Sequence, residues 1–210
     1  MAAPLSESEI ARELAAFEIP LLPPALAQLS CYLQLLLRWN RRINLTGIRD
    51  PKLMVRRLFG ESLAIARAVE LRGWLVDVGS GAGFPGLALK LVAPDLRVTL
   101  VEARQKKCAF LKEVARQCGF TGVEVVAERF EEWAPKGSAK ADLITTRAVL
   151  ADANLLQSFN KLLAPGGQAV FITTPELASR IQAMAAGFSL RRVTPSGPER
   201  DSVLAIVSFE

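Results

Sequence analysis

Three glycines at alternate positions follow a short apolar run and precede a helical pattern of apolar residues. The segment from Asp77 to Gly83 reads D-V-G-S-G-A-G. Glycines in such a turn let the backbone bend sharply and let a ligand approach the main chain closely. A dinucleotide site has the spacing G-x-G-x-x-G, and here Phe84 occupies the place of its last glycine. The loop therefore indicates a ligand that need not carry a pyrophosphate.

A carboxylate, Glu102, follows the next apolar run, 23 residues beyond Gly79. At that place a glutamate can accept hydrogen bonds from both hydroxyls of a ribose. A solvated glutamate at the end of a strand is the simpler interpretation when this residue is taken alone. Together with the glycines, Glu102 predicts a site for a ligand that contains a nucleoside.

The chain of 210 residues contains no histidine. This excludes Ser-His-Asp hydrolases, metal enzymes with histidine ligands and every mechanism with an imidazole base. The three cysteines, Cys31, Cys108 and Cys118, are odd in number and widely spaced. They argue for a reducing compartment and against a disulfide framework or a zinc cluster. Any reaction must use other side chains or must need no protein base.

Basic residues are concentrated in two parts of the chain, whose formal net charge is +5. Seven lie in the first part, where Asp50 is the only acid: Arg38, Arg41, Arg42, Arg49, Lys52, Arg56 and Arg57. The second part contains Arg104, Lys106, Lys107, Lys112 and Arg116. Each group alone is most simply a solvated helix face. Two such groups beside one site would instead favour a phosphate backbone as ligand, because each cation can displace condensed counterions.

The hydrophobic pattern divides the chain into a helical part, residues 1–72, and a part of alternating strands and helices, residues 73–210. In the first part we expect helices over 25–40 and 53–71, with a loop over 40–51. In the second we expect strands at 75–78, 97–101, 123–127, 142–146, 169–173, 188–193 and 203–209. Helices are expected at 85–93, 104–118, 151–163 and 175–186, and a turn at 165–167. This alternation predicts an α/β fold with a doubly wound, mostly parallel sheet and a final antiparallel hairpin.

Nothing in the sequence indicates a membrane protein. No apolar run approaches the roughly 18–20 residues that span a bilayer. The first ten residues lack the basic region and long apolar stretch of a signal peptide. We therefore expect a cytoplasmic protein.

The glycine loop, Glu102 and the L-L-A-P-G-G turn at 162–167 jointly resemble the class I S-adenosylmethionine-dependent methyltransferases. Their Rossmann-like, seven-stranded sheet with a C-terminal antiparallel hairpin matches residues 75–209. The resemblance implies a methyltransferase core over 73–210 and a helical N-terminal extension over 1–72.

The segment 32–51, Y-L-Q-L-L-L-R-W-N-R-R-I-N-L-T-G-I-R-D-P, narrows the choice. It resembles the segment before the core in the bacterial small-subunit ribosomal RNA guanine-N7 methyltransferases, also called the glucose-inhibited division protein B family. The R-F-E-E at 129–132 and the T-R-A at 146–148 also fit. Three places depart from the family pattern. Leu58 replaces a usual histidine, Glu61-Ser62 replaces Asp-Ser, and Ile172-Thr173-Thr174 replaces Leu-Lys-Gly.

The resemblance implies S-adenosylmethionine as cofactor. It implies small-subunit ribosomal RNA, free or in an assembled subunit, as the binding partner. We also expect a monomer and no metal ion. The implied cofactor contacts are Asp77, Gly79, Gly81, Gly83, Phe84, Glu102, Ala103, Phe130, Glu131 and Arg147. The implied RNA contacts are Arg38, Asn40, Arg41, Arg42, Asn44, Arg129 and Arg147. Guanine N7 carries a lone pair and no proton, so we expect no general base.

Several alternatives stay open at this point. Trp39 on the apolar helix face is expected in the core, Asn44 and Thr46 can cap a turn, and Glu131 can simply begin a helix. The protein could also be a class I methyltransferase for a small molecule or a protein. A non-catalytic RNA-binding module with a relic cofactor pocket is the third possibility.

Overall fold

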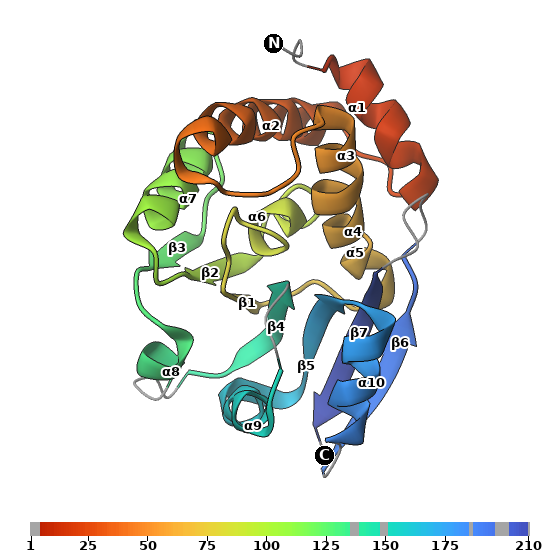
Figure 1. Ribbon diagram of the computed structural model, residues 1–210, viewed down its shortest axis with the longest axis vertical. Coiled ribbons are helices and arrows are strands. Elements are labelled where there is room, and N and C mark those ends of the chain that lie inside the picture. Colours follow the sequence, from red (N-terminus) through yellow and green to blue (C-terminus); the bar gives the residue numbers. More distant parts are fainter. Residues whose placement is uncertain (1–4, 135–138, 148–150, 185–186, 196–201, 210) are drawn as a thin grey trace.

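The computed structural model describes residues 5–134, 139–147, 151–184, 187–195 and 202–209. Its centre is a seven-stranded sheet with the order β3-β2-β1-β4-β5-β7-β6 (Figure 1). The strands are β1 (Trp74–Val78), β2 (Arg97–Val101), β3 (Val123–Val126), β4 (Ala141–Arg147), β5 (Leu163–Thr173), β6 (Phe188–Val193) and β7 (Val203–Phe209). The first five strands pair in parallel, whereas β7 pairs antiparallel with both β5 and β6. The predicted α/β fold, with a doubly wound, mostly parallel sheet and a final antiparallel hairpin, is thus confirmed.

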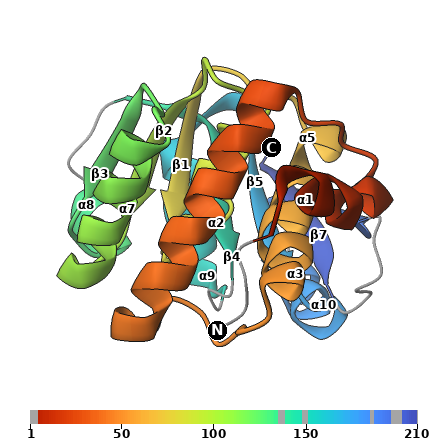
Figure 2. The ribbon, with the colours of Figure 1, turned by 90° about the horizontal axis from the view of Figure 1, so that it is seen from above.

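Helices cover both faces of the sheet. The chain begins with α1 (Glu7–Leu14), η1 (Ala15–Phe17), α2 (Pro23–Ile43), α3 (Pro51–Met54), the π-helix η2 (Val55–Gly60), α4 (Glu61–Leu63) and α5 (Ile65–Ala68). Later come α6 (Gly86–Leu89), α7 (Gln105–Gln117), α8 (Phe130–Trp133), α9 (Ala153–Leu162) and α10 (Pro175–Ala183). The helices α2, α6 and α7 lie on one face, and α8, α9 and α10 on the other (Figures 1 and 2). The sheet therefore has a hydrophobic core on each side.

The helical N-terminal part shares a hydrophobic core with the sheet. Ile10 of α1 and Leu33 of α2 belong to the same cluster of buried side chains as Leu100 of β2 and Leu143 of β4. Residues 5–72 are thus a layer packed on the sheet. The domain boundary between 1–72 and 73–210 stays a prediction based on sequence pattern.

The helix expected over 53–71 is present with two differences. The elements α3, η2 and α4 follow one another without a break and include a π-turn, and α5 ends at Ala68. In η2 the amide of Glu61 donates to the carbonyl of Arg56, five residues earlier, and the Ser62 hydroxyl donates to the carbonyl of Leu58 at 2.5 Å. A π-turn shifts the helical phase by one residue, and hydrophobic periodicity does not reveal such a shift. A Cβ on Gly60 would overlap the ring of Phe17, so glycine allows η1 to pack directly on η2.

Other boundaries differ from the expected ones in smaller ways. The helix α2 is longer than predicted, because Pro23 suits its first turn and the helix continues to Ile43. The helix expected over 85–93 ends at Leu89. Beyond it, the Lys90 ammonium donates hydrogen bonds to the carbonyls of Pro94 and Leu96. The turn expected at 165–167 lies within β5, although the pairing jumps from Leu163 to Gln168 and leaves 164–167 outside the ladder. The last residues of the helix expected at 175–186 lie outside the described part.

None of the helices within the described ranges is long and apolar enough to cross a membrane. The same ranges contain no group of three or more cysteine and acidic side chains placed to hold a metal ion.

Candidate functional site

The glycine loop leaves the carboxyl end of β1 with its amides already bonded. Gly79, Gly81 and Gly83 have φ values of +68°, +57° and +88°, a region that favours glycine. The amides of Gly79 and Ser80 donate to the carbonyl of Val101 at 2.9 and 3.1 Å, and Gly83 donates to Ser80 at 2.6 Å. A phosphate-binding loop presents free amides to its ligand. These amides are used inside the protein, so the loop suits a ligand without phosphates.

Glu102 joins the loop to the end of β2. Its Oε2 accepts from the amide of Gly81 at 3.0 Å and its Oε1 accepts from the amide of Arg104 at 2.8 Å. Each carboxylate oxygen can accept a second hydrogen bond. Glu102 can therefore fix the loop and still accept from the hydroxyls of a ribose, so these residues fit the expected nucleoside ligand.

Tyr32 of α2 holds the loop from the other side. Its hydroxyl donates to the carbonyl of Ala82 at 2.5 Å. Its ring stacks on Phe84 with centroids 5.3 Å apart and an interplanar angle of 6°. Phe84 is therefore a core side chain, and any contact of Phe84 with a ligand would use its backbone. The apolar pattern of α2 located the Tyr32 side chain in the core, but the target of its hydroxyl depends on the fold.

Asp77 lies beneath the glycine loop and is completely buried. Its Oδ1 accepts a hydrogen bond from the Thr145 hydroxyl at 2.8 Å. Burial raises the pKa of Asp77 to about 7, and the bond from Thr145 opposes this rise. The side chain does not reach the surface, which makes it a support for the loop.

Arg147 ends β4 beside the start of the loop, because Thr146 pairs with Val78 in the parallel ladder. Its Nη2 donates to Glu61 Oε2 at 2.7 Å. The Glu61 side chain is buried, and Arg57 Nε lies 3.6 Å from its other oxygen. Sequence reasoning did not select Glu61 as a site residue. The signal available was a single acid within the apolar segment 58–65.

The remaining expected contacts surround α8 and the end of β2. Ala103 and Glu131 are exposed. Phe130 is buried and packs against Phe159 with centroids 5.3 Å apart, so its ring belongs to the core. Arg129, an expected RNA contact, lies beyond the end of β3 at Val126 and is the exposed N-cap residue of α8. Glu131 lies in the first turn of that helix.

The two groups of basic residues meet at one edge of the molecule. The helix α2 runs antiparallel to α7, because Gln28 Nε2 donates to the carbonyl of Cys118 at 2.9 Å and Trp39 packs on Phe110 (Figure 2). The C-terminal end of α2 and the N-terminal end of α7 therefore point the same way, toward the carboxyl ends of the strands. This places Arg38, Arg41 and Arg42 on the same side as Arg104, Lys106 and Lys107. We define these six residues as the basic rim.

Asn40 fixes the loop that follows α2. Its side chain is buried, its Oδ1 accepts from the amide of Thr46 at 2.9 Å, and its amide group donates to the carbonyl of Thr46 at 3.0 Å. Asn44 is exposed with φ of 48° and ends the helix. The amide group of Asn40 thus holds the protein's own loop, while Asn44 faces solvent.

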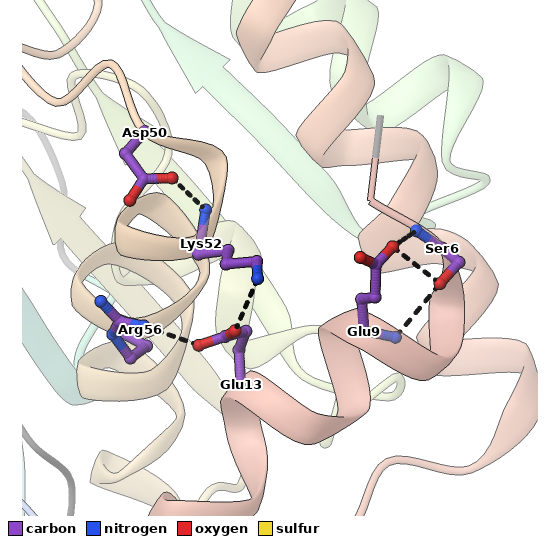
Figure 3. A network of polar contacts seen from close by, with 6 residues as sticks. All are labelled: Ser6, Glu9, Glu13, Asp50, Lys52 and Arg56. Carbon is purple, nitrogen blue, oxygen red and sulfur yellow. Dashed lines mark hydrogen bonds and ion pairs between the residues drawn. The ribbon is translucent and has the colours of Figure 1, made fainter. Parts of the chain in front are cut away.

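Part of the basic stretch faces acids of this chain. Lys52 and Arg56 lie 3.9 and 2.7 Å from the Glu13 carboxylate of α1 (Figure 3). The same view shows the capping box that begins α1, formed by Ser6 and Glu9. Because Arg57 lies beside Glu61, three of the seven basic residues are near carboxylates. The basic surface available to RNA is therefore smaller than the seven basic residues of 38–57 predict.

A family model described as GidB, rRNA small subunit methyltransferase G, matches residues 25–196. The chain belongs to the GidB family. Family relatives include the ribosomal RNA small subunit methyltransferases G of Halorhodospira halophila and Stenotrophomonas maltophilia. The first is 43% identical over 150 residues, 71% of this chain and 70% of the relative. The second is 39% identical over 175 residues, 83% of this chain and 79% of the relative.

Solved structures support the fold of this family member. A SAM-dependent methyltransferase from Aquifex aeolicus has a TM-score of 0.62 at 16% identity, over 80% of this chain and 97% of that chain. The glycopeptide N-methyltransferase MtfA, complexed with sinefungin, has a TM-score of 0.61 at 13% identity, over 72% of this chain and 86% of that chain. At these identities the likeness concerns the class I methyltransferase fold alone.

Proposed function

We propose that the protein transfers a methyl group from S-adenosylmethionine to N7 of a guanine in small-subunit ribosomal RNA. The observation that carries this proposal is the glycine loop with Glu102 next to the basic rim, in a member of the GidB family. Glu102 accepts from the ribose hydroxyls of the cofactor, and the loop lies against its remainder. The basic rim binds phosphates of the RNA. Arg147, at the end of β4, lies on the other side of the glycine loop from Glu102. Because its substrate is ribosomal RNA, the protein acts in the cytoplasm, and it acts as a monomer.

The reaction needs little from the protein beyond positioning. The cofactor, when bound, supplies an electrophilic methyl group. Guanine N7 has a lone pair and no proton to lose, so no side chain must remove one. The chain holds the base and the cofactor in line and close together, which can supply much of the rate enhancement. A chain without histidine suits this acceptor.

Two other functions are less well supported. A methyltransferase for small molecules or proteins has no need of two basic groups at one edge of the sheet. A non-catalytic RNA-binding module has no need of a glycine loop bonded to a buried glutamate.

Incubation of the protein with methyl-labelled cofactor and small-subunit RNA, free or assembled, tests the proposal. Label in 7-methylguanine supports it, and label only in protein or small molecules contradicts it.

The first prediction concerns the cofactor. Replacing Glu102 with Ala removes the charged acceptor and loosens Gly81, so cofactor binding should weaken by about 1.5–3 kcal/mol, the range for hydrogen bonds to charged groups. Isothermal titration calorimetry measures this directly. The exposed Glu132→Ala variant is a control and should bind as the wild type does. Unchanged affinity in Glu102→Ala would show that Glu102 does not contact the cofactor.

The second prediction concerns RNA. Replacing both Arg41 and Arg42 with Ala should weaken RNA binding and flatten its salt dependence by up to about one log-log unit for each lost phosphate contact. The control replaces Arg191 and Arg192, two exposed arginines on β6. A salt slope that is the same in both double variants would assign Arg41 and Arg42 to an ordinary solvated face.

The third prediction concerns pH. Single-turnover rates at saturating cofactor and RNA should be nearly constant from about pH 6 to 8.5, because positioning involves no protein base. Asp77 titrates in this range, with a pKa of about 7, but its buried carboxylate does not face the surface. The controls are Asp77→Asn and the double variant Cys108→Ala, Cys118→Ala. A single ionisation that persists in both controls would require a catalytic base.

A further inference from the structure

A partly buried cluster with one negative and two positive side chains lies at the end of β4. It contains one carboxylate, Glu61, which is 0% exposed, and two guanidinium groups, those of Arg57 and Arg147. Arg147 Nη2 is bound to Glu61 at 2.7 Å, whereas Arg147 Nη1 is buried and has no hydrogen-bond partner among the residues that the structure describes. Native proteins rarely leave a buried donor without a partner. A ligand oxygen that reaches Nη1 would supply the acceptor that these residues do not provide.

The cluster lies beside the glycine loop. Arg147 follows Thr146, which pairs with Val78, so it stands beside the glycine loop at the carboxyl edge of the sheet. Ligands bind at this edge in doubly wound folds. Glu61 reaches the cluster directly after the π-helix η2, a kind of distortion that is often found at functional sites.

We propose that Glu61 is a positioning residue that holds one arm of Arg147, so that the other arm, Nη1, donates to O6 of the target guanine. This inference rests on the proposed function. Guanine presents O6 and N7 side by side as acceptors, and a free arginine commonly bonds to both. An arginine bound in that way would occupy the lone pair that must attack. Because Glu61 engages Nη2, Nη1 is the terminal nitrogen left to donate to O6, and N7 stays open.

Glu61 also balances charge during the reaction. The N7–CH₃ bond forms from the N7 lone pair while the S–CH₃ bond breaks, and the bonding pair stays on sulfur. The positive charge passes from sulfur to guanine, and no proton moves. A bare guanidinium beside O6 would repel the developing guanine cation. The Glu61 carboxylate, which also lies beside Arg57, offsets part of the positive charge at this point.

The test compares three RNA substrates at the methylated nucleotide: guanine, inosine, which keeps O6, and 2-aminopurine, which lacks it. For the wild type we expect kcat/KM to fall about 10- to 100-fold on 2-aminopurine and to stay within a few-fold on inosine. In Arg147→Lys, kcat/KM should fall by a similar factor on guanine and should hardly fall further on 2-aminopurine. The effects of the variant and of the missing O6 are then not additive. Comparing both proteins on both bases cancels any difference in the intrinsic reactivity of N7.

Variants of the cluster separate positioning from folding. Arg57→Lys perturbs the same carboxylate and should show no coupling to O6. Glu61→Gln should lower kcat on guanine without raising the KM for cofactor, and Glu61→Asp should restore part of the loss. If Arg147→Lys does not fold, Glu61→Gln takes its place in the comparison of guanine with 2-aminopurine, and an equal loss on both substrates would contradict the inference.

Two results would overturn the inference. One is an equal loss from Arg147→Lys on guanine and on 2-aminopurine, and the other is a loss of cofactor affinity that accounts for the whole defect. Either would leave the proposed function standing, since the wild type would still methylate guanine. If the wild type methylates no guanine in small-subunit RNA, the proposed function itself fails.

Discussion

Replacing Asp77 with Asn is expected to raise the free energy of unfolding at pH 8 by about 4 kcal/mol relative to the wild type, and to change it little at pH 4. Burial raises the pKa of this carboxyl from 3.8 to about 7 in the folded protein. Each factor of ten in proton affinity corresponds to about 1.4 kcal/mol, which gives this estimate. Asn keeps an acceptor for the Thr145 hydroxyl and never carries the buried charge.

The sign follows from proton uptake. Between pH 3.8 and about 7 the folded protein binds the Asp77 proton and the unfolded chain releases it. Stability from this group is therefore complete below pH 3.8 and is lost as the pH rises through about 7. Urea unfolding of both proteins at several pH values measures the difference, with the exposed Asp95→Asn as control. A difference between Asp77→Asn and the wild type that is constant with pH would contradict the raised pKa.

Replacing Gly83 with Ala is expected to lower the free energy of unfolding by about 2 to 6 kcal/mol and to impair cofactor binding. A φ of +88° costs roughly 1–3 kcal/mol for an L-residue. The new Cβ would overlap the Tyr32 hydroxyl and approach Leu87 Cδ1 to 2.9 Å, and overpacking of this kind costs another 1–3 kcal/mol or so.

Gly119 provides the matched control for Gly83. Its φ is +67°, but a Cβ there would meet nothing within 4 Å, so Gly119→Ala should show the backbone cost alone. The double variant Tyr32→Phe, Gly83→Ala should recover part of the loss, because the clashing hydroxyl is gone. Denaturant unfolding compares all three. Equal losses in Gly83→Ala and Gly119→Ala would mean that the contact with Tyr32 carries no energy.

The strands and the cofactor loop were predictable from the sequence because their signals are local. β-rich runs predicted the bounds 97–101, 188–193 and 203–209 as the structure has them. Glycine spacing and Glu102 located the loop, whose hydrogen bond from Gly81 to Glu102 joins two neighbouring strands. The carboxyl ends of neighbouring parallel strands lie at the same edge of a sheet, so residues that follow two such strands are expected close together.

The partners of individual side chains were not predictable in this way. Hydrophobic periodicity indicates which face of α2 is buried, but it does not indicate that the Tyr32 hydroxyl reaches Ala82. The pair of Glu61 and Arg147 joins residues that are 86 positions apart. A π-turn before Glu61 changes the phase of the helix and thus the direction of that side chain. The sequence shows how many basic residues lie in 38–57, but it does not show that Glu13 of α1 forms an ion pair with Arg56 (Figure 3).

The central claim is the methylation of guanine N7 in small-subunit ribosomal RNA. Mapping of 7-methylguanine in this RNA, from cells with and without the protein, tests it most directly. We expect a methylated guanine that is lost without the protein, returns with the wild-type chain and fails to return with Glu102→Ala. An identical pattern of 7-methylguanine in both kinds of cell would contradict the proposed function.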